Sequence, residues 1–473
     1  FEQDSNEGVF YSYGVGARTY GSIWPNRVPQ PEMYQMKKST QPLKFTFAGD
    51  GKIEVWNRSH FLNASFYRTT WSLMEDDKVI QQGEFNLDVA PLSRTVVNVP
   101  YSMPEIVPGK EYRLDISSVL RNDELWAPKG FEVSWDQIEF PSWKVPAVPA
   151  KVTGKASLKD GENMITVEGN GFSYGFDKKT GHLTSIVSAG KEMMSSPMVL
   201  NLWRAPLANE LDGWNGRSAG QVSVNGYGSI GHSSVLASHY YAAGLDRLTT
   251  MTVSVSPREA GDAVIIDVRE LVTMGAAQNR QLDAYIMGTS YNGFESIYSY
   301  RIEADGTMTL NHTLRPQGNM PSWLPRIGLT MDVNESLSNV QWYGRGPQEN
   351  YPDRKSGYRI GIYNDKVENF YEPYLIPQDN GLRTDNRYVC LTDDSGKGFV
   401  VKMNEPFAFS VSEYSTDNLT KAVYTYQLKK AGATTFNLDY ATSGVGCTAR
   451  GIFDAYRAYP QGYQRTITIQ PVK

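Results

Sequence analysis

Hydrophobic and polar residues alternate along most of the chain from Leu43 onward. The alternation is clearest in LKFTFAGDGKIEVWNRS, ASFYRTTWSLMEDDKVIQQGEFNLDV, TVVNVP, EYRLDISSVL and GFEVSWDQIEF. Successive side chains of a β-strand point to opposite faces, so this pattern predicts half-buried strands. Turn residues at Gly49–Gly51, Glu75–Asp77 and Pro108–Gly109 separate them at the spacing of a sandwich of about 100 residues. We therefore predict an immunoglobulin-like β-sandwich over residues 42–143.

A proline-rich stretch, PSWKVPAVPAKVTGKA, follows the predicted sandwich. Proline fixes the backbone and removes a hydrogen-bond donor, so we expect an extended linker at residues 144–150. The strand pattern then resumes and continues to Lys473, and no long segment with helical periodicity interrupts it. A strand-rich region of this length predicts a large antiparallel double sheet over residues 151–473. The expected fold class is all-β.

Residues 1–41 differ from the rest of the chain. They are rich in glycine, proline and tyrosine and show no sustained period. We interpret them as the tail of another domain followed by a linker.

Composition excludes several classes of function. The chain has 473 residues, a net charge of −5 and no run of apolar residues near the roughly 20 that a membrane helix requires. Without a cluster of Lys and Arg, nucleic acid is not an expected partner, and membrane insertion is not expected either. Cys390 and Cys447 lack the spacing of a zinc site, and we interpret both as buried thiols. The histidines also lack the spacing of metal ligands, so no metal site is predicted; they are His60, His182, His232, His239 and His312.

The segment WYGRGPQENYPDRKSG, which starts at Trp342, combines glycines, prolines and hydrogen-bonding side chains. Its composition predicts a rigid loop and not a strand. The loop could form a buried polar network, in which Glu349, Asp353 and Arg354 satisfy one another, or it could bind a ligand. The signature residues are Gly346, Pro347, Gln348, Glu349, Asn350, Tyr351, Pro352, Asp353 and Arg354.

This segment resembles the signature of the C-terminal, small-chain domain of the β-galactosidases among the family 2 glycoside hydrolases. Further stretches resemble the same domain in the same order: GNGFSYGFDKKTGHLTS, NLWRAPLANE, PYLIPQDNGLRTDNRYV and LDYATSGVGC. Upstream, NRVPQPEMYQMKKSTQPLKF resembles the junction between the catalytic barrel and the fourth domain of that family. The resemblance implies a galactose-mutarotase-like supersandwich over 151–473, an immunoglobulin-like domain before it, and a barrel tail within residues 1–41.

The resemblance also implies that catalysis lies elsewhere. Retaining glycosidases use two carboxylates about 5 Å apart, and this family carries both on a barrel of around 250 residues. No alternation of strands and helices typical of such a barrel occurs in this chain. We therefore expect no catalytic residue here and no glycoside hydrolysis by this chain alone.

Two loops of this family reach the sugar pocket, so their counterparts supply candidate pocket residues. The first loop offers Arg204, Asn209, Glu210, Asp212 and Trp214; the family usually has Asp where Ala208 and Glu210 stand. A tryptophan beside acidic and amide groups suits a sugar lid, and docking between domains is an equal alternative.

The second loop offers Cys447 and Arg450, in a place where some members carry a tryptophan that stacks on the leaving-group sugar. Near the N-terminus, Tyr13 and Arg18 stand where the family has a Phe-Cys-x-x-Gly segment that helps to hold the galactose 6-hydroxyl and a sodium ion. These departures predict altered handling of the galactose C6 position, or a modified galactoside as substrate.

The expected partners follow from the same resemblance: a β-galactoside carbohydrate, the catalytic barrel of the same protein, and further copies in a homo-oligomer. No cofactor site is expected in this chain, although the family often uses magnesium and sodium. Two other functions stay open. One is a stand-alone carbohydrate-binding module, and the other is an aldose epimerase, which needs a paired base and acid such as His and Glu.

Overall fold

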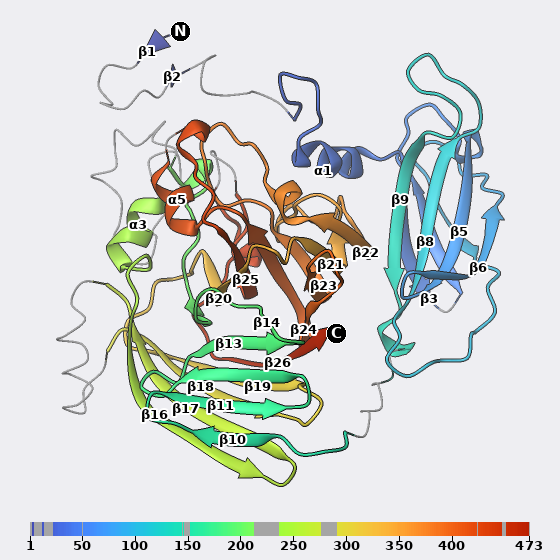
Figure 1. The fold of residues 1–473 in the computed structure, drawn as a ribbon. Helices are drawn as coiled ribbons and strands as arrows, with labels where there is room; N and C mark the ends of the chain where they lie inside the picture. Colours follow the sequence, from blue (N-terminus) through green and yellow to red (C-terminus); the bar gives the residue numbers. More distant parts are fainter. Residues whose placement is uncertain are drawn as a thin grey trace. The chain divides into compact units, whose positions relative to one another are not determined.

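The computed structural model describes residues 2–3, 12–13, 22–49, 51–143, 145, 152–211, 236–275, 291–422, 424–446 and 451–472. These residues are mostly β-strand, which confirms the all-β prediction (Figure 1). The chain divides into two compact units, each described by itself. The sandwich unit contains Gly21–Lys151 and Ser356–Ile362. The supersandwich unit contains Phe1–Tyr20, Val152–Lys355 and Tyr363–Lys473.

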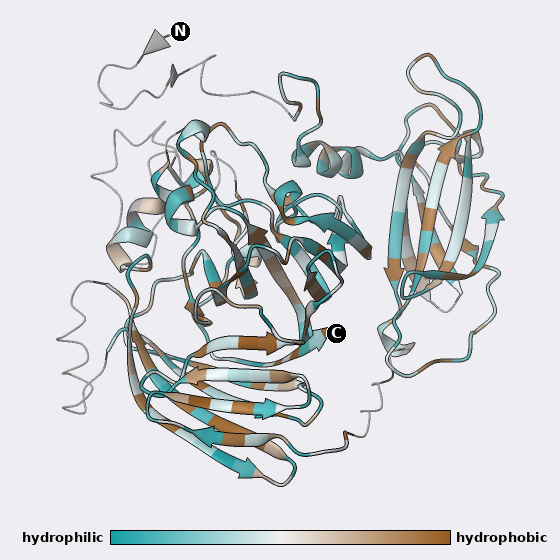
Figure 2. Cartoon of the chain, viewed as in Figure 1, coloured by the Kyte–Doolittle hydropathy of each residue, from teal (hydrophilic) through white to brown (hydrophobic). Residues whose placement is uncertain are grey.

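The sandwich unit is built from two antiparallel sheets. Their orders are β3-β4-β7 and β6-β5-β8-β9. Buried side chains alternate with more exposed ones along most of β5. Figure 2 shows bands of hydrophobic and hydrophilic colour along the strands of this unit. Leu43, Trp71 and Leu114 belong to one shared hydrophobic core. The strands are β3 (Leu43–Gly49), β4 (Lys52–Asn57), β5 (Tyr67–Glu75), β6 (Lys78–Phe85), β7 (Arg94–Asn98), β8 (Tyr112–Leu120) and β9 (Glu132–Glu139).

A helix, α1 (Pro31–Thr40), precedes the first of these strands, although we predicted no periodic element there. Its sequence carries start and stop signals: Pro31 stands in the first turn with Glu32, and Lys37 and Lys38 stand in the last. These residues favour a helix for two reasons. The backbone N–H that proline lacks would have no partner within the helix in the first turn, and the acidic and basic side chains interact favourably with the positive and negative ends of the helix dipole. Hydrophobic periodicity alone could not reveal the helix, since Pro31 is its only described buried residue.

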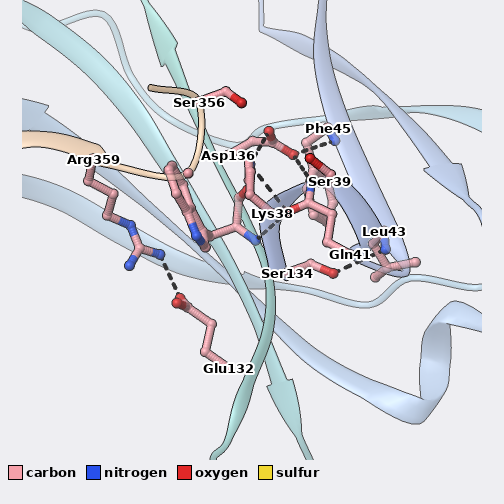
Figure 3. A network of polar contacts seen from close by, with 12 residues as sticks. Lys38, Ser39, Gln41, Leu43, Phe45, Glu132, Ser134, Asp136, Ser356 and Arg359 are labelled. Atoms are coloured by element: carbon pink, nitrogen blue, oxygen red, sulfur yellow. Dashed lines mark hydrogen bonds and ion pairs between the residues drawn. The ribbon is translucent and has the colours of Figure 1, made fainter. Parts of the chain in front are cut away.

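A polar network ties the end of α1 to the sheets of the sandwich unit (Figure 3). The Lys38 ammonium donates to Asp136 Oδ1 over 2.7 Å and to the carbonyl of Trp135, and it lies 3.9 Å from the Trp135 ring centroid. Burial lowers the pKa of Lys38, and Asp136 opposes this shift. The other Asp136 oxygen accepts from the Phe45 amide over 2.8 Å. One carboxylate therefore links α1, β3 and β9.

The short segment Ser356–Ile362 completes the sandwich unit. The Gly357 amide donates to Gln35 Oε1 over 2.9 Å, and the Ile360 amide donates to Gln137 Oε1 over 2.7 Å. A Cβ on Gly357 would lie 2.8 Å from backbone atoms of Gln35. Only glycine allows this close approach to α1 without a backbone shift.

The supersandwich unit contains a five-stranded sheet, β10-β11-β12-β13-β14, and a twelve-stranded sheet. The large sheet runs β15-β20-β25-β24-β26-β19-β18-β17-β16, with β23 on β24, β21 on β23 and β22 on β21. The described strand pairings of both sheets are antiparallel; for example, Leu329 of β20 lies opposite Leu438 of β25. Long strands such as β16–β19 are bent, and β10, β11 and β13 are seen beside them in Figure 1.

Side chains from both sheets form one core. Tyr174 and Phe176 of β12 are fully buried, Phe176 packs on Tyr300 of β18 with ring centroids 5.0 Å apart, and the Tyr174 hydroxyl donates to the Gly306 carbonyl over 2.6 Å. The expected antiparallel supersandwich is thus confirmed. Its first strands are β10 (Ser157–Asp160), β11 (Met164–Gly169), β12 (Phe172–Asp177), β13 (Leu183–Ser188), β14 (Lys191–Glu192), β15 (Val199–Asn201), β16 (Thr249–Ala260), β17 (Ala263–Thr273) and β18 (Gly293–Ile302).

The remaining elements complete the large sheet and its connections. The strands are β19 (Met308–Gln317), β20 (Arg326–Asn334), β21 (Asn339–Gly346), β22 (Arg359–Lys366), β23 (Arg383–Thr392), β24 (Gly398–Ser412), β25 (Ala433–Thr442) and β26 (Tyr463–Val472). The helices are α2 (Ala208–Leu211), α3 (Leu236–Ala243) and α5 (Thr416–Lys421). Near the N-terminus, β1 (Glu2–Gln3) pairs with β2 (Ser12–Tyr13).

The prediction that the signature segment is a loop throughout is wrong for its first part. Trp342 to Gly346 belong to β21, and Trp342 is fully buried against Phe370 and Phe409. Aromatic packing keeps this part of the chain in the sheet despite its glycines. The loop begins only at Pro347.

No helix among the described residues is long and apolar enough to cross a membrane.

Candidate functional site

Four segments that lie far apart in the sequence meet in the supersandwich unit, and we call them the loop cluster. They are the first pocket loop with α2 (203–211), the signature loop (346–354), the segment 374–386, and the end of β25 with the stretch after it (437–446). The four segments are held together by buried ion pairs and by hydrogen bonds to the backbone.

Arg204 and Glu210 form the first ion pair of the cluster. Arg204 is fully buried, and its Nη2 lies 2.7 Å from Glu210 Oε1. The guanidinium also donates to the carbonyls of Ser443, over 2.7 Å, and Gly444, over 3.0 Å. Burial would lower the pKa of Arg204, but the Glu210 carboxylate together with Tyr240, Asp379 and Tyr351 outweighs burial and holds the pKa above its ordinary value. Arg204 thus ties the first pocket loop to the stretch after β25.

The second Glu210 oxygen stabilises the loop that carries it. It accepts from the Leu207 amide over 2.8 Å, while Oε1 also accepts from the Tyr240 hydroxyl of α3 over 3.0 Å. Glu210 itself is 2% exposed, and the residues that donate to it are also buried. Glu210 therefore has a structural partner set and is not open to a ligand in this arrangement.

The signature loop holds a second buried ion pair, between Glu349 and Arg354. Glu349 Oε2 also accepts from the Gly381 amide over 2.7 Å, and Oε1 accepts from the Tyr374 hydroxyl. Both charged side chains are buried, which fits the polar-network interpretation of this loop. Glu349 links the signature loop to the segment 374–386.

Asp353 does not join the Glu349–Arg354 pair of its own loop, contrary to the polar network that the sequence predicts. Its two oxygens accept from the backbone amides of Val445, over 2.9 Å, and Gly446, over 2.7 Å. Asn209 contacts the same dipeptide and donates to the carbonyls of Val445, over 3.2 Å, and Gly446, over 3.3 Å. Two side chains from separate loops thus hold one dipeptide.

A third buried group contains residues that the sequence analysis did not single out. Arg326 Nη2 lies 3.3 Å from Asp379 Oδ1, and its Nε lies 3.0 Å from Asp439 Oδ1. Tyr351 donates to Asp379 Oδ2 over 2.9 Å. Within the described part of the chain, neither Asp439 oxygen accepts a hydrogen bond of good geometry. Burial raises the pKa of Asp439 to about 7, although Arg326 opposes the shift. Charged residues inside strands were the sequence signal that could have found this group.

Several predicted pocket residues lie outside the described residues: Asp212, Trp214, Arg18, Cys447 and Arg450. Tyr13 lies in β2, where its backbone pairs with Glu2. The structure brings Arg204 and Glu210 together in the interior, and it leaves Asn209 exposed at the edge of the cluster. Asn209 is thus the predicted pocket residue whose side chain is described and exposed to solvent.

The described histidines occupy four separate environments. His182 forms a pair with Glu270 over 2.6 Å, but Glu270 is 1% exposed, so the pair joins the β12–β13 turn to β17 and does not face solvent. His312 is fully buried between Ser296 and Tyr440, and burial lowers its pKa to about 3. His60 lies beside Phe61, and His239 lies in α3.

No group of three or more His, Cys, Asp or Glu within the described ranges is arranged to hold a metal ion. Cys390 is a half-buried free thiol, and burial raises its pKa. These observations identify no reactive group in the loop cluster. Chemically, the cluster can fix the positions of loops, as the Asn209 amide does for Val445 and Gly446.

Two family models match the chain. The model described as beta galactosidase small chain matches residues 168–469, and the model described as beta-galactosidase, domain 4 matches residues 53–141. The chain is similar to the β-galactosidase of Priestia megaterium, with 28% identity over all of this chain and 42% of that protein. It is also similar to the β-galactosidases of Pseudoalteromonas haloplanktis (26% identity, 90% of this chain, 39% of that protein) and Kluyveromyces lactis (27%, 98% and 40%).

Among solved structures, the galactose 1-epimerase of Lactobacillus acidophilus aligns with 68% of this chain and 99% of its own length, at 11% identity and a TM-score of 0.35. The chain spans about two fifths of the length of the curated relatives that it matches. The small-chain match covers more than half of the chain, from the second strand of the supersandwich unit almost to its end. By this match the chain belongs to the β-galactosidase small-chain family.

Proposed function

We propose that this chain is the C-terminal, non-catalytic portion of a β-galactosidase. In the complete enzyme, a catalytic barrel would hydrolyse terminal, non-reducing β-galactosides with retention of configuration, using two carboxylates of its own. The supersandwich unit would support that barrel and lend loops to the sugar pocket. The observation that carries the proposal is the match to β-galactosidases over 90–100% of this chain but only 39–42% of their length.

The loop cluster supports the same proposal. Four buried ion pairs fix its loops: Arg204 with Glu210, Arg354 with Glu349, and Arg326 of the adjoining strand β20 with Asp379 and Asp439. Binding and catalytic groups in enzymes commonly lie on loops that a rigid scaffold positions. A buried ionic scaffold with an exposed amide at its edge is suited to such a supporting role.

The test compares substrates in the enzyme assembled with its barrel. The proposal predicts hydrolysis of nitrophenyl β-galactoside with the β-anomer of galactose released first, as followed by NMR. It also predicts much weaker hydrolysis of the β-glucoside and none of the α-galactoside. Release of the α-anomer, or equal rates for β-galactoside and β-glucoside, would contradict it. Titration of the isolated chain with galactose and lactose distinguishes a stand-alone carbohydrate-binding module, which would bind sugar without the barrel.

A further inference from the structure

The stretch after β25 contains a dipeptide, Val445–Gly446, whose backbone amides and carbonyls are all hydrogen-bonded to side chains. Its two amides donate to the two oxygens of one carboxylate, Asp353, over 2.9 and 2.7 Å. Its two carbonyls accept from one amide side chain, Asn209, over 3.2 and 3.3 Å. All four backbone polar groups of the dipeptide are thus satisfied by two side chains. Hydrogen bonds to a carboxylate are stronger than those between neutral groups, so Asp353 is the stronger of the two contacts.

The glycines before and within the dipeptide, Gly444 and Gly446, confirm that the contact is close. A Cβ on Gly444 would lie 2.3 Å from the Asp353 carboxyl carbon, so no other residue fits there without a shift. Gly446 has φ +61°, a conformation that favours glycine, and a Cβ there would lie 2.8 Å from the carbonyl carbon of Gly451. Gly451 also has a positive φ, of +64°. The backbone at Gly446 therefore lies directly against the backbone at Gly451.

We infer that Asp353 and Asn209 are positioning residues: they hold the Val445–Gly446 dipeptide and so make a fixed base of the backbone at Gly446 and Gly451. This inference rests on the proposed function for its consequence: the second predicted pocket loop starts at this base. Asp353 belongs to the signature loop and Asn209 to the first pocket loop, so the three loops share one anchor.

Hydrogen exchange on the whole chain tests the positioning role without any activity. In Asp353→Asn we expect the amides of Val445 and Gly446 to exchange about tenfold faster or more, because they lose a charged acceptor. The amides of β25, before this stretch, should keep their rates. Asp417→Asn, an exposed aspartate paired with Lys421, is the matched control and should change neither. Unchanged rates at Val445 and Gly446, or equal acceleration throughout β25, would overturn the inference.

Asn209→Ala keeps the test decisive if Asp353→Asn fails to fold, because Asn209 is exposed and carries no buried charge. We expect it to accelerate exchange in the segment 443–446 by a smaller factor, about two- to fivefold, since amide contacts to carbonyls are weaker than those to a carboxylate. No change in this segment would remove Asn209 from the anchor.

Kinetics of the enzyme assembled with its barrel test the consequence. In both variants we expect kcat/KM for nitrophenyl β-galactoside to fall through KM, because the first pocket loop, the signature loop and the stretch after β25 lose their shared anchor. An unchanged KM in both variants would overturn this consequence. An assembled wild-type enzyme without galactosidase activity would instead refute the proposed function and leave the exchange result standing.

Discussion

Replacing Arg204 by methionine is the sharpest test of the buried ionic scaffold. The side chain is fully buried and makes three polar contacts, to Glu210 and to the carbonyls of Ser443 and Gly444. Methionine keeps much of the apolar stem but none of the charge. Among the described residues, the change leaves the buried Glu210 carboxylate with the Tyr240 hydroxyl and the Leu207 amide as its donors.

The expected cost follows from this uncompensated charge. Removing one partner of a buried ion pair typically costs about 3–5 kcal/mol, so Arg204→Met should lower the free energy of unfolding of the supersandwich unit by that amount. The double variant Arg204→Met/Glu210→Gln removes the stranded charge as well. We expect it to recover about 1–3 kcal/mol relative to the sum of the two single changes.

The assay is a urea titration in which unfolding is monitored by hydrogen exchange and mass spectrometry. This readout reports peptides of the supersandwich unit separately from those of the sandwich unit. A midpoint shift at constant slope measures the loss of stability. Lys421→Met, which breaks an exposed pair with Asp417, serves as control and should cost below about 1 kcal/mol. A loss of less than about 1 kcal/mol in Arg204→Met, or no recovery in the double variant, would refute the reasoning.

Three further substitutions test other parts of the molecule. Asp439 has a folded-state pKa of about 7 against an ordinary value of 3.8, so the folded state binds its proton more tightly and stability should fall by up to about 4 kcal/mol as pH rises from 4 to 7. Asp439→Asn should flatten that slope in urea titrations at each pH, and an unchanged slope would contradict the shift. Trp342→Ala should lower the free energy of unfolding of the supersandwich unit by about 3–5 kcal/mol in the same assay, because it leaves a cavity at a fully buried aromatic site. A loss below about 1 kcal/mol would mean that the site collapses or is not tightly packed. Lys38→Met should destabilise the sandwich unit alone by about 1–3 kcal/mol, since Asp136 keeps its other donors; equal destabilisation of both units in peptide-resolved exchange would count against that assignment.

The sequence predicted the strands of the sandwich unit well, for a physical reason. Period-two alternation is a local signal, and glycine at the turns reports a local backbone requirement: Gly49 and Gly51 have φ of +121° and +66°. Helix α1 escaped the same reasoning because its contacts with the sheets are polar, through Lys38, and its hydrophobic pattern is weak. Capping signals, and not periodicity, would have found it.

The loop cluster was predicted only in part. The resemblance pointed to segments that meet in the loop cluster, and the charge pattern indicated that Glu349 and Arg354 pair. The partner of Asp353 is a backbone dipeptide 92 and 93 positions away in the sequence, and no local pattern encodes such a contact. Arg326 and Asp439 were missed because a charged residue within a strand pattern is normally exposed, whereas both are buried here. Burial of charge depends on the packing of distant strands, which one sequence does not show.

The measurement that tests the central claim most directly is the hydrolysis of nitrophenyl β-galactoside by this chain alone, by a chain carrying the catalytic barrel of the same enzyme, and by the two together. The account predicts no turnover by this chain, little by the barrel alone, and at least tenfold more when the two are combined and co-elute. Turnover by this chain alone would contradict the account, because the catalytic carboxylates would then have to lie within it. Full activity of the barrel without this chain would contradict the proposed supporting role.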